Sequence, residues 1–286
     1  MKRIICLFIV LIFSGSGVAG LFDDRLPSAR ATAMSGAVVA LQGDVWAPYY
    51  NPASLSSIDN YQIGGSYQIP YNLSFFRNYF VSGVIPTPYG TAAVSMQNFG
   101  VQYQGNDLSS EYTFGISHGF YLMKDVHSSL SAGYNLKYYY WSLSESIDGF
   151  DLGSGSTFGL DIGLQGSIYN RTYIGVYLLN INTPHIGALT KYELPQRIAA
   201  GIAYQPLTDL ITAISFNKTS GFDIQVEGGF EYHIIPLLAL RLGASTAPNR
   251  FSGGIGLSHD NIRFDYALRT HPVLAETHQF GLSYLF

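Results

Sequence analysis

From about residue 59 to residue 286, apolar side chains alternate with small or polar ones along the chain. Near the C-terminus, Phe280, Leu282, Tyr284 and Phe286 all share one parity. A β-strand points successive side chains to opposite faces, so each such segment has one apolar and one polar face. Counting the repeats predicts about fourteen strands, an even number, with the last strand pairing with the first near Tyr61–Ile69.

Charged residues follow this alternation. The apolar parity of the well-alternating strands carries no Asp, Glu, Lys or Arg. A Lys or Arg that faces lipid at the middle of a membrane costs about 2–4 kcal/mol, so a membrane-spanning wall requires this sorting. The alternative, a soluble β-sandwich with its apolar face inside, would carry far more charge on its surface. Five positive and five negative residues take the other parity: Lys137, Asp161, Arg197, Asp223, Glu227, Glu231, Arg241, Arg263, Asp265 and Arg269.

The composition favours an antiparallel transmembrane β-barrel. The 286 residues are 47% hydrophobic and 12% charged, and they include 31 Gly, 22 Tyr and 18 Phe. Charged residues make up about a quarter of an ordinary soluble domain. No apolar run approaches the roughly 20 residues that a membrane-spanning helix needs. The net charge of −4 argues against nucleic acid as a partner.

The chain begins with the pattern of a secretory signal peptide. Met1-Lys2-Arg3 is positively charged, an apolar run follows to Phe13, and small residues lead to Gly20. We expect residues 1–20 to be removed on export together with Cys6, the lone cysteine, which leaves no disulfide or thiol chemistry. Residues 21–58 lack the alternation, and two prolines four apart, Pro48 and Pro52, predict a compact segment of short helical turns.

The predicted connections between strands alternate in length. Long ones are expected near Pro70–Asn78, Ser142–Ser156 and Asn182–Leu194, and tight ones lie between them. Short turns on the periplasmic side and longer loops outside are typical of bacterial outer-membrane barrels. One turn, Asp260-Asn261, would place His259 and Ile262 on one face, so we expect a third turn residue or a bulge there.

The polar face predicts a filled barrel interior. Glu231 and Arg241 flank one tight turn and should lie almost opposite each other, which predicts a cross-strand ion pair. Balanced, paired charges suggest an interior packed against another part of the chain. Residues 21–58 precede the first strand and are the natural filler. The alternative, a flexible periplasmic tail, is disfavoured by their apolar residues.

Motifs at both ends resemble a known superfamily. The run Ala29–Ala37, Asp44 and the motif Asn51-Pro52-Ala53 resemble the long-chain fatty-acid transporter (FadL-like) superfamily of outer-membrane proteins. Within it, Asp265-Tyr266-Ala267 and Thr277–Phe280 look like the ending of the PorV/PorQ-type proteins, which are associated with type IX secretion. Ser35 stands where those families usually have the first Gly of a Met-Gly-Gly-Ala run.

The resemblance implies a fourteen-stranded barrel whose lumen is blocked by an N-terminal hatch, with Asp44, Asn51, Pro52 and Ala53 as the hatch motif. In the fatty-acid transporters, hydrophobic ligands pass a surface groove and a lumenal pocket, and they leave as the hatch shifts or through a gap in the wall. PorV-type proteins instead bind exported proteins or secretion components. This chain is short, so its outer loops leave little room for a large apolar capture groove.

Two functions therefore stay open for a protein of the bacterial outer membrane. One is a plugged channel for passive transport of small hydrophobic molecules, and the other is a PorV/PorQ-like accessory or substrate-binding component of protein secretion. The expected partners are membrane lipids, the outer-membrane assembly machinery, and either a hydrophobic ligand or secretion-system components. We expect Tyr284 and Phe286 to form the C-terminal assembly signal. A lumenal charge network, part of which would anchor the hatch, is expected from Asp223, Glu227, Glu231, Arg241, Arg263 and Asp265.

The sequence predicts neither an enzyme nor a metal or cofactor site. Gly115-Ile116-Ser117-His118-Gly119 matches the nucleophile pattern of hydrolases, but that motif needs a sharp strand-to-helix turn. Here Ser117 lies in the middle of a predicted strand. The seven His are scattered, with no two at the spacing of metal ligands.

Overall fold

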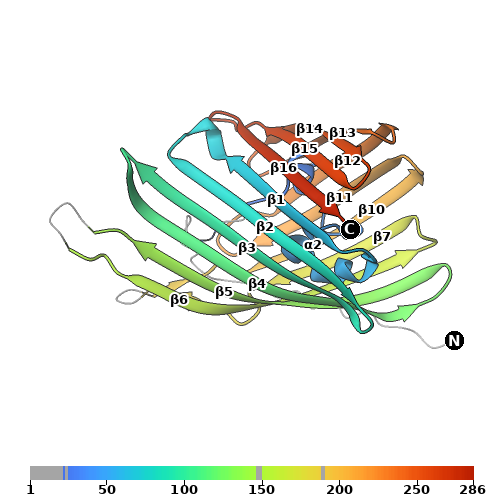
Figure 1. Ribbon diagram of the computed structural model, residues 1–286, viewed down its shortest axis with the longest axis horizontal. Helices are drawn as coiled ribbons and strands as arrows, with labels where there is room; N and C mark the ends of the chain where they lie inside the picture. The colour runs from blue at the N-terminus through green and yellow to red at the C-terminus, as the bar shows by residue number, and fades with distance from the viewer. Residues whose placement is uncertain (1–21, 23–24, 146–149, 188–190) are drawn as a thin grey trace.

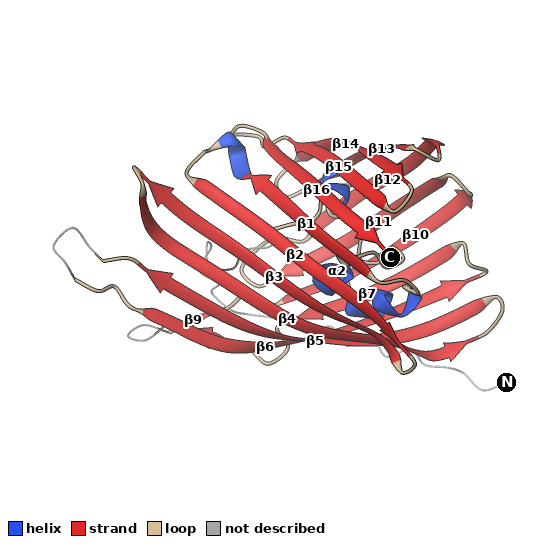
Figure 2. Cartoon of the chain, viewed as in Figure 1, coloured by secondary structure: helices blue, strands red, loops and turns tan. Residues whose placement is uncertain are grey.

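The alternating residues form one closed antiparallel β-barrel (Figures 1 and 2). The computed structural model describes all residues except 1–21, 23–24, 146–149 and 188–190, so the predicted signal peptide lies outside the described part. The barrel of about fourteen strands is confirmed. The predicted closure is also confirmed, because the last strand pairs with the first from Gln62↔Leu285 to Ile69↔His278. No helix in the described part is long and apolar enough to cross a membrane.

Each wall strand pairs only with its neighbours in the wall. The wall strands are β1 (Gln62–Ile69), β2 (Phe76–Thr87), β3 (Gly90–Tyr103), β4 (Asn106–Lys124), β5 (Ser128–Leu143), β6 (Ser154–Ile168), β7 (Thr172–Leu179), β10 (Arg197–Leu207), β11 (Leu210–Thr219), β12 (Gln225–Ile235), β13 (Leu238–Ser245), β14 (Arg250–His259), β15 (Ile262–Arg269) and β16 (Thr277–Leu285).

The two parities of the wall strands face opposite sides of the barrel. On β4, Ile116 is 64% exposed on the outside, whereas the neighbouring Ser117 is 1% exposed and faces the lumen. Aromatic pairs lie toward both ends of the outer apolar band, such as Tyr67–Tyr79 and Tyr284–Phe286, with ring centroids 4.9 and 4.8 Å apart. Aromatic girdles flanking an apolar band are typical of barrels that sit in a membrane.

The two ends of the barrel differ in their connections. At one end, here called the turn end, every connection has two or three residues, and the C-terminus lies there. At the opposite loop end lie the longest connections, although β3 and β4 are joined by only two residues. The expectation of a bulge at Asp260-Asn261 was wrong. His259 pairs directly with Ile262, and both face outward, because residues that flank a two-residue turn share a face.

Strands β3 to β6 make one side of the barrel taller at the loop end (Figure 1). They contain 14 to 19 residues, against eight in β1, β7, β13 and β15. Beside them, the connection between β7 and β10 carries a two-stranded sheet, β8 (His185–Ile186) and β9 (Tyr192–Glu193). Ile186 and Leu194 from this connection are buried against Tyr139 on the inside of β5.

Residues 25–58, here called the inner segment, lie inside the barrel (Figure 2). The segment contains α1 (Ala29–Ala33), α2 (Ala47–Tyr50) and the 3₁₀ helix η1 (Pro52–Ser57). It bonds to the wall on several sides, including from Thr32 Oγ1 to Gln279 Oε1 at 2.5 Å and from Gln165 Nε2 to the carbonyl of Leu41 at 2.7 Å. Some polar lumenal side chains therefore find their partners in this segment. A second 3₁₀ helix, η2 (Pro70–Asn72), lies in the connection between β1 and β2.

Candidate functional site

Asn51-Pro52-Ala53 is a junction between the inner segment and the wall. The Asn51 side chain caps η1, because its Oδ1 accepts a hydrogen bond from the Ala53 amide at 3.1 Å and Pro52 occupies the first turn. Its Nδ2 lies 3.0 Å from the carbonyl oxygen of Val39 and 3.1 Å from that of Leu164 on β6. One buried amide thus joins two parts of the segment to each other and to the barrel.

Wall glycines make this close approach possible. Gly119, Gly133 and Gly163 lie side by side on β4, β5 and β6, as neighbouring residues in register. A Cβ at Gly163 would lie 2.1 Å from Asn51 Oδ1, and a Cβ at Gly133 would lie 2.4 Å from the Pro52 carbonyl carbon. No side chain fits between the motif and the wall, so the three glycines form the seat of Asn51-Pro52-Ala53.

On the opposite wall, a chain of ion pairs holds α1. The predicted pair of Glu231 and Arg241 is confirmed, with Arg241 Nε 2.5 Å from Glu231 Oε2. Arg241 also contacts Asp265 Oδ1 at 2.5 Å through Nη1. Arg30 joins this network from the inner segment, with its Nε 2.8 Å from Glu231 Oε2 and its Nη1 3.1 Å from Asp44 Oδ2. The guanidinium groups of Arg30 and Arg241 share one buried carboxylate, which ties the segment to β12, β13 and β15.

The other three predicted network residues lie elsewhere. Glu227 Oε2 accepts a hydrogen bond from Asn217 Nδ2 at 2.6 Å and lies against Gly36 of the inner segment. Asp223 is exposed in the connection between β11 and β12. The chain turns at Gly221, whose φ is +81°, and β12 begins only at Gln225. Its predicted place on an inward strand face was wrong.

Arg263 faces inward on β15, two residues from the turn end, and is half-buried. Among the described residues, no ion pair links Arg263 to the network around Glu231. The expectation that it belongs to that network was therefore not met, because the network is centred farther from the turn end, where Arg241 of β13 and Asp265 of β15 meet across the intervening strand β14.

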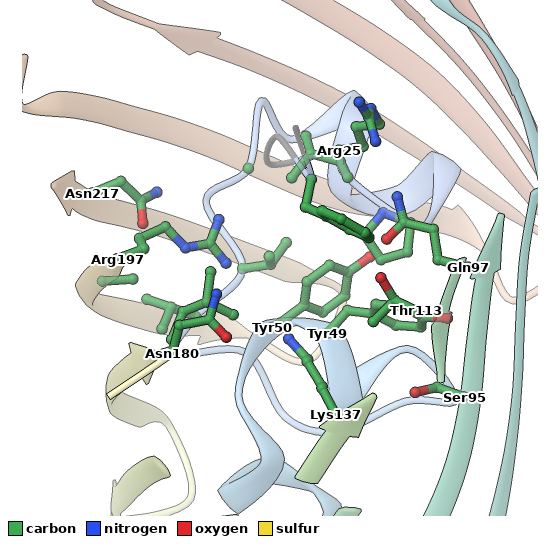
Figure 3. Close-up of a pocket in the computed structure, with 18 of the residues that line it drawn as sticks. Arg25, Tyr49, Tyr50, Ser95, Gln97, Thr113, Lys137, Asn180, Arg197 and Asn217 are labelled. Carbon is green, nitrogen blue, oxygen red and sulfur yellow. The ribbon is translucent and has the colours of Figure 1, made fainter. Parts of the chain in front are cut away.

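An inner cavity lies between the inner segment and the wall strands β3, β4, β5 and β10 (Figure 3). It holds about 930 Å³ of empty space, part of it open to solvent, and has a mixed lining. In Figure 3, Gln97 and Thr113 lie on one side of it, and Asn180, Arg197 and Asn217 lie on the other. Apolar parts of the lining come from Phe22, Leu26, Val38, Val39, Leu179 and Ala199.

A larger vestibule opens above this cavity at the loop end. It holds about 1860 Å³ of empty space, including its open mouth. Phe99 and Trp141 line the side of the tall strands, Phe76 lines the side of the neighbouring β2, and Arg250 and Arg269 line the side of β14 and β15. The vestibule and the inner cavity share part of their lining, here called the junction: Arg25, Leu26, Phe99, Glu111, Asn217 and Glu227.

The junction is built around a stacked arginine. The guanidinium carbon of Arg25 lies 3.6 Å from the centroid of the Phe99 ring, and Nη1 contacts Glu111 Oε2 at 2.8 Å. The stack and the ion pair hold Arg25 against the tall wall. Sequence reasoning missed Arg25 and Phe99, because neither residue belongs to a motif and their contact joins the inner segment to a distant strand.

A third pocket, at the turn end, lies on the other side of the inner segment. Its described lining includes Gln42, Ser56, Lys124 and Gln165, and none of its lining residues also lines the inner cavity. The inner segment separates the two, because Val39 lines the inner cavity and Gln42 lines the turn-end pocket.

Other sequence features have structural places. Ser117 lies within β4 and faces the lumen, with no sharp strand-to-helix turn beside it. Among the described residues, no three His, Cys, Asp or Glu are grouped to hold a metal ion. At the C-terminus, Tyr284 faces outward, and the Phe286 amide donates a hydrogen bond to the carbonyl of Tyr61 at 2.9 Å, while its side chain is 67% exposed.

Similar barrels occur among solved structures. The Ralstonia pickettii toluene transporter TbuX is 13% identical, with a TM-score of 0.66, over 91% of this chain and 99% of that one. The monoaromatic hydrocarbon channel CymD is 12% identical, with a TM-score of 0.64, over 91% and 97%. A Pseudomonas aeruginosa FadL homologue is 11% identical, with a TM-score of 0.62, over 93% and 99%. These likenesses show that the chain shares the barrel fold of these proteins. No protein-family model matches the chain, and comparison with curated proteins yields no match.

Proposed function

We propose that this protein is a channel of the bacterial outer membrane that lets small hydrophobic molecules pass down their concentration gradient. The observation that carries the proposal is the continuous lining from the vestibule through the junction to the inner cavity. The similar barrels of TbuX and CymD, described as a toluene transporter and a monoaromatic hydrocarbon channel, support the same substrate class. The loop end would face outward and the turn end the periplasm.

In this proposal the inner segment is the hatch. The seat of Asn51-Pro52-Ala53 and the ion pairs of Arg30 fix it at two places on opposite walls. It stands between the inner cavity and the turn-end pocket, so passage requires a shift of the segment or an exit through the wall. Tyr49 marks one place where a wall exit could form, since its hydroxyl lies 2.8 Å from the Met96 carbonyl on β3 and 3.1 Å from that of Val81 on β2.

Uptake into cells tests this function. Radiolabelled toluene would be supplied to a host with an intact outer membrane, with and without the expressed protein, before and after an uncoupler removes the energy gradient. The proposal expects protein-dependent uptake that the uncoupler leaves unchanged. Equal uptake with and without a correctly assembled barrel would contradict it.

A second candidate is the PorV/PorQ-like role in type IX secretion. The tall strands β3 to β6 favour it, because they carry exposed side chains such as Tyr103 and Leu108 beyond the shorter part of the wall. Such a projecting edge could dock a protein. A pull-down from native outer membranes separates the two candidates. Copurified secretion components together with the absence of toluene uptake would favour this role over transport.

A further inference from the structure

In the inner cavity, charged side chains are held by other protein groups, whereas some of the neutral polar groups keep open hydrogen-bonding capacity. Lys137 Nζ lies 2.7 Å from Asp161 Oδ2. Arg25 is fixed between Glu111 and the Phe99 ring, as described above. A charged ligand would have to compete with these contacts, and its desolvation would also cost free energy. The lining therefore favours a neutral ligand.

Two of the neutral groups with open capacity lie on β3 and β4. Gln97 and Thr113 face each other directly across these strands, and both line the cavity (Figure 3). Thr113 is 9% exposed, and its hydroxyl makes no hydrogen bond to another described residue. The amide of Gln97 makes only one long hydrogen bond of 3.4 Å, from Nε2 to Asn78 Oδ1, which leaves its oxygen without a donor in the described chain.

Asn217 adds an acceptor at the junction. Its Nδ2 donates a hydrogen bond to the Glu227 carboxylate at 2.6 Å, and this contact fixes the orientation of the amide. The amide oxygen, Oδ1, is therefore the atom that can accept a further hydrogen bond. This oxygen is buried and has no hydrogen-bond partner among the described residues, and the side chain is 8% exposed. Buried acceptors are usually satisfied, so this oxygen beside the cavity is an open position for a hydrogen-bond donor.

We propose that the inner cavity selects small neutral molecules that carry a hydroxyl group on an apolar body, and that Thr113 is the residue that determines this specificity. The Thr113 hydroxyl and the Gln97 amide bind the ligand hydroxyl, while Val38, Leu179 and Ala199 contact the apolar body. Asn217 offers a first acceptor as the ligand passes the junction. The inference rests on the proposed channel function and narrows its substrate class.

Phenol and toluene form the matched ligand pair for the test, because they differ by a hydroxyl in place of a methyl group. Binding of each is measured by saturation-transfer NMR on the protein in lipid nanodiscs, with empty nanodiscs subtracted. The test variant is Thr113→Val, which keeps the side-chain shape and removes the hydroxyl. The control is Thr212→Val, a change on the exposed outer face of β11.

We expect Thr113→Val to weaken phenol binding by about tenfold, the effect of one hydrogen bond of ordinary strength. Toluene binding should change by less than about twofold, and Thr212→Val should change neither. The proposed selection would be overturned if Thr113→Val weakened the binding of both ligands equally or left phenol binding unchanged. In either case, toluene binding to the wild-type protein would still support the channel function. If neither ligand binds the wild-type protein, both the selection and the channel function are contradicted.

Discussion

Arg30 and Glu231 form a two-pronged ion pair that joins the inner segment to the barrel wall, with Nε–Oε2 at 2.8 Å and Nη2–Oε1 at 2.9 Å. The same carboxylate accepts from Arg241 Nε. Buried charges held in this way are weak contributors to net stability, but removing one partner leaves the others without compensation. Glu231 is therefore the residue on which the attachment of α1 depends most.

Replacing Glu231 by Gln should destabilise the barrel by about 3 kcal/mol, because two buried guanidinium groups lose their shared counterion. Urea unfolding of the refolded protein in lipid vesicles measures the change. Asp260→Asn is the control, since that side chain is 85% exposed in a turn and should alter stability by no more than about 0.5 kcal/mol. Equal stability of Glu231→Gln and wild type would contradict the role assigned to the network.

Gly163→Ala should displace the Asn51-Pro52-Ala53 motif from its seat. The added methyl group would lie 2.1 Å from Asn51 Oδ1, so either the segment or the strand must move, at a cost of about 1–3 kcal/mol. The midpoint of thermal unfolding reports the loss. Gly65→Ala on β1 is the matched control, because nothing lies within 4 Å of its added methyl group. Similar midpoints for the two variants would show that the seat tolerates the methyl group.

A disulfide between Ser35→Cys and Ser252→Cys should lock the inner segment to β14. The two hydroxyl oxygens lie 2.6 Å apart, and Cys6→Ser removes the only other cysteine. If toluene leaves by a shift of the segment, oxidation should abolish protein-dependent uptake and a reductant should restore it. The two single cysteine variants serve as controls. Uptake that persists in the oxidised double variant would instead indicate an exit through the wall.

The loop between β15 and β16 should loosen in mild acid. Burial, followed by the charges of Arg250 and Arg269, lowers the pKa of His271 from its usual value of 6.5. Neutral Nδ1 accepts hydrogen bonds from the amides of Val273 at 3.2 Å and Leu274 at 3.0 Å. Because the folded-state pKa is the lower one, this stabilisation is present above about pH 6.5 and is lost as the pH falls through the folded pKa.

Amide hydrogen exchange at Val273 and Leu274, corrected for the intrinsic pH dependence, should therefore accelerate as the pH falls from 7 to 5. In His271→Gln the corrected rates should not depend on pH, since no group titrates at that position. Protection that is the same at both pH values in the wild-type protein would contradict the role of the imidazole.

The barrel wall could be predicted from the sequence because its signals are local. Alternation and the parity of charges place Ile116 outside and Ser117 inside without knowledge of any neighbour. The pair of Glu231 and Arg241 was predictable for the same reason, as the two residues flank one turn. The alternation also continued through Phe222 and Asp223 into a turn, and there the predicted strand began too early.

The contacts of the inner segment could not be predicted from local sequence patterns. Arg30 and Glu231 are 201 positions apart, and no periodic pattern connects them. The glycines that seat Asn51-Pro52-Ala53 come from three strands, and their alignment depends on the register of the whole wall. The resemblance of short motifs suggested a hatch, but only the folded chain brings Arg25 and Phe99 together at the junction.

The central claim, a path through the junction, is tested most directly by blocking the junction after the barrel has folded. Leu26→Cys in the Cys6→Ser background places a thiol where the vestibule and the inner cavity meet, and Leu282→Cys places one on the outer face. Cells with each variant are treated with a bulky thiol reagent, and the initial rate of toluene uptake is measured. The account predicts that treatment removes at least about nine-tenths of the protein-dependent uptake in Leu26→Cys and leaves Leu282→Cys unchanged. Undiminished uptake by fully modified Leu26→Cys would contradict it.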